Sequence, residues 1–85
     1  MKSFEQQKAT VFNNQVQRLI QKYLESHSIN PQNINIGQFS DIQLLVSTSY
    51  PNNFANQTFV NFIFYRSFYY YDDLKHFSYR PYYII

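Results

Sequence analysis

The chain has 85 residues, a net charge of +2 and no cysteine. This length allows one domain at most, and the missing cysteine excludes disulfides, thiolate metal sites and cysteine nucleophiles. The charge is too small to indicate a nucleic-acid partner by itself. Most of the nine Phe and nine Tyr residues lie from Tyr50 onward. A chain this short cannot cover them all, so we expect a partner protein or a lipid phase to bury part of this aromatic surface.

The N-terminal residues 2–26 carry apolar side chains at three- and four-residue steps, which predicts an amphipathic helix. Polar residues such as Gln17 and Gln21 fill most of the other positions. A mitochondrial presequence is the alternative interpretation of such a segment, and acidic residues such as Glu5 weaken it.

Residues 29–50 form the predicted connector. The helical region is disfavoured for the residue before Pro31, so the first helix should end ahead of it. Ser40, with Gln43 three residues later, has the spacing of an N-cap and a weak capping box. This spacing predicts a short helix over 41–48, although a strand would also suit the sequence.

Residues 51–73 contain the longest aromatic run and form the predicted membrane-spanning helix. A helix over 54–71 would be about 27 Å long, close to the roughly 30 Å of a bilayer core. Asn53, Gln57 and Asn61 are four residues apart, and one polar stripe suits a span that packs against other proteins. A soluble helix packed in a core is the alternative. The residues assigned to span packing are Phe54, Asn61, Phe62 and Ile63.

Arg66 is followed by a tyrosine cluster and then by the acidic pair Asp72–Asp73. Tyrosine is enriched at membrane interfaces, and an arginine near the end of a span can extend its charge into water. This order is typical of a helix leaving the bilayer. The residues assigned as membrane-interface anchors are Tyr65, Arg66, Tyr69, Tyr70 and Tyr71.

No catalytic motif is present in the sequence, because a single glycine cannot build the glycine-rich loops that bind phosphates. Asp72 and His76 are the one pair with a helix-compatible metal spacing, and a lone pair of this kind is usually an ordinary surface feature. We therefore expect no catalytic residue, no metal and no cofactor.

A nucleic-acid partner is the main soluble alternative. Exposed aromatic rings stack on bases, and basic side chains contact phosphates. Two aspartates among the basic residues weaken the electrostatic groove, so nucleic acid is not favoured. The residues that this hypothesis would use are Tyr65, Tyr69, Tyr79 and Tyr82 for stacking and Arg66, Lys75 and Arg80 for phosphates.

The C-terminal half carries Phe62-Ile63-Phe64-Tyr65-Arg66, then Phe68, Asp72-Asp73 and His76-Phe77-x-Tyr79. Over roughly residues 52–81 this pattern resembles the small AGGG-type accessory subunit of mitochondrial NADH:ubiquinone oxidoreductase, respiratory complex I. The resemblance implies a structural subunit of the membrane arm, in the mitochondrial inner membrane, that binds no flavin, iron–sulfur cluster or quinone. It implies that His76, Phe77 and Tyr79 dock the tail on a neighbouring subunit.

Together these observations predict an all-α, non-catalytic chain whose partners are membrane-arm subunits and membrane lipids. Its function would be to support assembly and stability of the complex. The alternatives are a subunit of cytochrome oxidase or ATP synthase, or a soluble ribosomal or RNA-associated protein. The predicted segments are an amphipathic helix over 1–28, a connector over 29–50, the span over 51–73 and an extended aromatic tail over 74–85.

Overall fold

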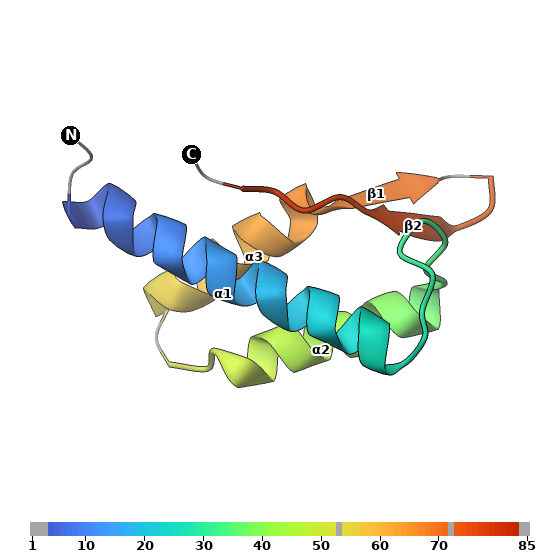
Figure 1. Cartoon of the computed structure of the whole chain (residues 1–85), viewed down its shortest axis with the longest axis horizontal. Helices are drawn as coiled ribbons and strands as arrows, with labels where there is room; N and C mark the ends of the chain where they lie inside the picture. The colour runs from blue at the N-terminus through green and yellow to red at the C-terminus, as the bar shows by residue number, and fades with distance from the viewer. Residues whose placement is uncertain (1–3, 53, 72, 84–85) are drawn as a thin grey trace.

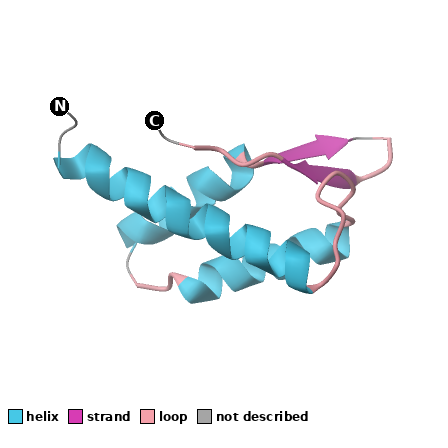
Figure 2. Cartoon of the chain, in the orientation of Figure 1, coloured by secondary structure: helices cyan, strands magenta, loops and turns pink. Residues whose placement is uncertain are grey.

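The computed structural model describes residues 4–52, 54–71 and 73–83. Helix α1 packs against α2 and α3, and the strands lie beyond the end of α3 (Figure 1). Figure 2 shows the strands confined to the C-terminal part of the chain. The elements are α1 (Phe4–Ser26), α2 (Ile36–Ser49), α3 (Phe54–Arg66), β1 (Phe68–Tyr71) and β2 (His76–Tyr79).

The all-α prediction is wrong, because β1 and β2 form an antiparallel hairpin. β1 consists of four consecutive aromatic residues, and aromatic side chains fit the pleated, half-buried surface of a sheet. Lys75 adopts a φ of 52° in the turn, and its N–H donates to the Tyr71 carbonyl at 2.8 Å. The aromatic run therefore leaves the helix at Arg66, and the tail predicted over 74–85 contains a strand.

The predicted membrane-spanning helix over 51–73 is also wrong. Helix α3 has 13 residues. At about 1.5 Å per residue it is about 20 Å long, well short of a bilayer core of roughly 30 Å. Across the described residues, no helix combines the length and the apolar character that crossing a membrane requires.

Helix α1 buries a stripe formed by Val16, Ile20 and Leu24, which recur every four residues. The helix ends in a Schellman motif. Ser28 adopts a φ of 53°, the Ile29 N–H donates to the Leu24 carbonyl at 2.9 Å, and the Ser28 N–H donates to Glu25 at 3.2 Å. This motif turns the chain sharply back toward β2.

The N-cap of helix α2 lies five residues earlier than the predicted N-cap at Ser40. Asn35 caps it, because its side chain accepts from the Gln38 N–H at 2.8 Å. The Gln38 side chain accepts in return from the Asn35 N–H at 3.1 Å, which completes the capping box. Ser40 lies inside the helix, where its hydroxyl donates to the Ile36 carbonyl at 2.9 Å.

Strand β2 lies between β1 and the segment after α1. Ile34 and Phe77 exchange two backbone hydrogen bonds of 2.8 and 2.7 Å. Phe77 stacks on Phe39 of α2 with ring centroids 3.8 Å apart, so one face of the hairpin closes the helical core. The core draws on every element except β1, and its buried residues are Val16, Ile20, Leu24, Ile34, Phe39, Ile42, Val46, Val60, Ile63, Phe64 and Tyr79.

Candidate functional site

Tyrosines and arginines that are at least partly exposed gather where α3 meets the hairpin. We call this surface, made of Tyr65, Arg66, Tyr69, Arg80 and Tyr82, the Tyr–Arg face. With Phe68 and Pro81 it lines a shallow groove of about 500 Å³. None of these lining residues carries a carboxylate, so the groove is locally positive.

Both arginines of the face stack on aromatic rings. The Arg66 guanidinium lies 4.8 Å from the centroid of the Tyr82 ring and 5.7 Å from that of Phe62. The Arg80 guanidinium lies 4.8 Å from the centroid of the Tyr69 ring. Each stacking contact favours one orientation of a long side chain while the charge stays exposed. The face thus holds two partly ordered cations between rings that are at least partly exposed.

Ser67 is the buried pivot that places the two arginines side by side. Its N–H donates to the Ile63 and Phe64 carbonyls, both at 3.1 Å, which finishes α3 just after Arg66. Its own carbonyl accepts from the Arg80 N–H at 2.6 Å. The residue that ends the helix and the residue that follows β2 are thereby held as neighbours.

Gln17 of α1 holds Ser67 in place through a hydrogen bond. Its side-chain amide donates to the Ser67 hydroxyl at 2.7 Å and to the Tyr82 carbonyl at 3.0 Å. Its amide oxygen accepts a hydrogen bond from the Tyr79 hydroxyl. The side chain of Gln17 is 1% exposed, although the amphipathic pattern assigns this residue to the polar positions of the helix. No pattern distinguishes it in sequence from Gln21, which is exposed.

The five predicted interface anchors separate into two groups. Tyr65, Arg66 and Tyr69 belong to the Tyr–Arg face, and the Tyr65 hydroxyl accepts from the Gln43 amide at 2.7 Å. Tyr70 and Tyr71 lie further along β1, where each is about half exposed. Three of the five anchors therefore share one surface of the protein, and the role of all five at a membrane interface stays a prediction.

The residues predicted for span packing do not share a face. Ile63 is buried in the chain's own core, whereas Phe62 and Asn61 are exposed. The side chain of Phe54, like Asn53 of the predicted polar stripe, lies outside the described part of the structure.

The residues predicted for tail docking form β2. Tyr79 is buried and Phe77 is half-buried against Phe39, so both rings pack inside this chain. His76 is half-buried at the far end of the strand and pairs with Tyr71.

The residues predicted to contact a nucleic acid lie together only in part. Its members Tyr65, Tyr69, Tyr82, Arg66 and Arg80 make up the Tyr–Arg face. Tyr79 is in the core and Lys75 lies in the hairpin turn. Asp72, of the metal-compatible pair, lies outside the described residues, and within the described ranges no three His, Cys, Asp or Glu side chains gather.

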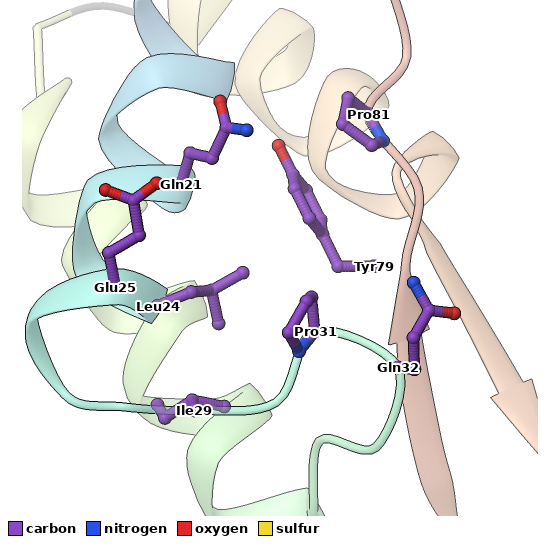
Figure 3. Close-up of a pocket in the computed structure, with 8 residues that line it drawn as sticks. All are labelled: Gln21, Leu24, Glu25, Ile29, Pro31, Gln32, Tyr79 and Pro81. Carbon is purple, nitrogen blue, oxygen red and sulfur yellow. The ribbon is translucent and has the colours of Figure 1, made fainter.

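A second, smaller pocket of about 270 Å³ lies between α1 and the C-terminal segment (Figure 3). Apolar side chains, among them Leu24, Ile29 and Pro31, form much of its wall. Glu25 is the single charged residue in its lining, so no acid–base pair is available there. Its remaining lining residues are Gln21, Gln32, Tyr79 and Pro81.

Comparison of the chain with protein-family models, curated proteins and solved structures finds no match. The resemblance to the complex I accessory subunit therefore stays a prediction.

Proposed function

We propose that this chain is a non-catalytic protein-interaction module of a larger assembly, and that it docks through the Tyr–Arg face. The partner surface that fits it combines apolar area with exposed carboxylates. The observation that carries the proposal is the pair of ring-stacked arginines between half-exposed tyrosines, Tyr65 being 56% and Tyr69 50% exposed.

The composition of the face matches protein interfaces. Tyrosine and arginine are among the residues that contribute most binding energy at such interfaces, whereas Lys, Asp and Glu are depleted there. Rings that are already packed and arginines that are already stacked lose little rotamer freedom on binding. Carboxylates on the partner would form charge-assisted hydrogen bonds with Arg66 and Arg80.

A nucleic-acid ligand fits the same face less well. Neutralising two phosphates gives a slope of about −1.4 to −1.8 for log K against log salt, far below that of proteins making six to ten phosphate contacts. Two arginines would therefore supply little of the sequence-independent affinity on which nucleic-acid binding depends.

Membership of respiratory complex I is the narrower form of the proposal, and the resemblance over residues 52–81 is what supports it. In this form the chain sits on membrane-arm subunits through the Tyr–Arg face, as a structural subunit at the mitochondrial inner membrane. Cytochrome oxidase and ATP synthase are the alternative hosts.

Native gel electrophoresis of the tagged full chain, expressed in its own cells, tests the proposal. We expect the chain to migrate with a large assembly and Arg66→Leu to lower its incorporation about tenfold, the effect of about 1.4 kcal/mol at an interface arginine. Catalytic activity per assembled complex should not change. Arg18→Leu is the matched control, because Arg18 is exposed on α1 outside the face.

Equal incorporation of the two arginine variants would overturn the proposal. Loss of co-migration after nuclease treatment would instead favour the nucleic-acid hypothesis. The identity of the co-migrating complex decides among the respiratory hosts.

A further inference from the structure

We propose that the outer edge of β1 pairs antiparallel with β1 of a second copy of this chain, forming a two-fold symmetric dimer. The inference concerns the strand edge and goes beyond the proposed function of the Tyr–Arg face. It stands or fails independently of any other partner.

The hydrogen bonds of β2 determine which backbone groups of β1 are free. Phe77 and Tyr79 donate away from β1, to Ile34 and Pro31 at 2.7 and 2.6 Å. Because backbone groups alternate along a strand, His76 and Ser78 must direct theirs toward β1.

Their partners in the register are Tyr71 and Tyr69, whose backbone groups therefore point inward. The bond from the Lys75 N–H to the Tyr71 carbonyl fits the same alternation. Phe68 and Tyr70 consequently direct their N–H and C=O groups to the open side of β1. This side presents two donors and two acceptors in the pattern that another strand requires.

Apart from its short length of four residues, the edge lacks the features that usually protect a strand from pairing. Natural edge strands carry lysine, proline, a bulge or an inward-pointing charge. β1 consists of one Phe and three Tyr, and Tyr69, Tyr70 and Tyr71 are each about half exposed. Its aromatic composition favours pairing, because cross-strand aromatic pairs stabilise sheets.

A second copy satisfies this edge better than an arbitrary strand. With the two-fold axis beside Tyr69, Phe68 of each copy faces Tyr70 of the other, and all four outward donors and acceptors of each strand are used. Shifting the strands by one residue would set outward groups against inward ones. Among the registers that the alternation allows, the one centred on Tyr69 is selected because it uses all four outward groups of each strand.

The charges at the two ends of β1 complement each other in this arrangement. Arg66 lies two residues before β1, and Asp73 lies two residues after it. Antiparallel pairing brings the basic end of one strand next to the acidic end of the other, twice per dimer. A parallel arrangement would place like charges together.

The dimer we infer is weak. A half-exposed tyrosine presents roughly 100 Å², so the six tyrosines of two edges offer roughly 600 Å², less than a standard interface of about 1,200–2,000 Å². The two-fold axis runs perpendicular to the sheet, so both Tyr–Arg faces lie on the same side of it. Dimerisation would thus present two copies of the face to a common partner.

Single-cysteine variants test the register directly, because the chain has no cysteine of its own. The Cα atoms of Tyr69 and its symmetry mate would lie about 4.5 Å apart, within the range that a disulfide bridges. Those of Tyr71 and its mate would lie about 14 Å apart. After oxidation we expect Tyr69→Cys to form a covalent dimer and Tyr71→Cys, equally exposed, to remain monomeric.

Sedimentation equilibrium of two Tyr70 variants supplies the second measurement. Tyr70→Pro removes an outward N–H that β2 does not use, and proline is tolerated on edge strands, so the variant should fold and remain monomeric. Tyr70→Ala keeps the N–H and should still associate. Circular dichroism checks that both variants are folded, and both retain Arg66, so failure here is separate from failure of the proposed function.

A wild-type chain that is monomeric at about 1 mM would overturn the inference, since even very weak specific association is populated there. So would equal cross-linking of the two cysteine variants, or equal association of the two Tyr70 variants.

Discussion

The Tyr79 hydroxyl is the most strongly perturbed titratable group in the described part of the chain. Burial, reinforced by the charge that Tyr83 would carry, raises the pKa of Tyr79 well above the ordinary tyrosine value. The hydroxyl donates to Gln17, so its protonated form is the one that the core requires. Burial also raises the pKa of Tyr50.

This shift predicts how stability depends on alkaline pH. The unfolded chain releases the Tyr79 proton near pH 10, whereas the folded chain retains it, so the unfolded state binds fewer protons above that pH. The stabilisation is fully present below pH 10. Above it, the free energy of unfolding should fall by up to about 1.4 kcal/mol per pH unit for this residue.

Urea unfolding between about pH 8 and pH 11.5 measures this slope, and Tyr79→Phe is the comparison. The variant should lose about 1 kcal/mol at pH 8 because the hydrogen bond to Gln17 is gone, and its slope above pH 10 should be shallower. Identical slopes would show that Tyr79 does not titrate differently in the two states.

At the scale of the elements, the sequence offers two candidate N-caps for α2, and the structure uses the earlier one. Asn35 and Gln38 make the capping box, whereas Ser40 and Gln43, with the same spacing, lie inside the helix. The earlier pair prevails because Ile34 is fixed by its bridge to Phe77, which sets where the chain can enter the helix. The three-residue spacing of a capping box does not reveal this bridge between distant residues, so it cannot choose between the two caps.

The two caps give a direct test. Asn35→Ala should lower the free energy of unfolding by about 1 kcal/mol, the usual cost of removing an N-cap side chain. Ser40→Ala should change it by less than about 0.5 kcal/mol, as a surface substitution does. Thermal unfolding followed by circular dichroism compares them, and a larger loss for Ser40→Ala would contradict the assignment of the cap.

At the scale of the whole molecule, Gln17 joins α1 to chain segments that follow it by 50 or more residues. Three hydrogen bonds in a buried site connect the first helix, the pivot at Ser67 and the C-terminal segment. Removing them affects the packing of α1 and the position of the Tyr–Arg face together.

We predict that Gln17→Ala lowers the free energy of unfolding by about 2–4 kcal/mol, because it leaves a cavity and removes the hydrogen bonds of the Gln17 amide to the Ser67 and Tyr79 hydroxyls. Gln21→Ala, one turn later in the same helix at an exposed position, should cost less than about 0.5 kcal/mol. Chemical denaturation of both variants makes the comparison. Similar losses in the two would rule out Gln17 as the structural link.

The aromatic surface predicted from the sequence is present in the structure, but in a different arrangement. The sequence predicts more aromatic rings than this chain can cover. In the structure, the tyrosines of α3 and β1 are about half exposed. The prediction that lipid covers them through a spanning helix is wrong, because α3 ends at Arg66. Of the predicted anchors, Tyr65, Arg66 and Tyr69 lie together on one face, while Arg80 and Tyr82 join them from the C-terminal segment.

The sequence by itself determined the features that depend on local periodicity and on residue type. The four-residue spacing of Val16, Ile20 and Leu24 predicts the buried stripe of α1, and the absence of cysteine excludes thiol chemistry. Only the tertiary structure decided that Phe68–Tyr71 is a strand and that Gln17 is buried. Both outcomes depend on contacts between distant residues, such as Phe39 with Phe77, which no local pattern encodes.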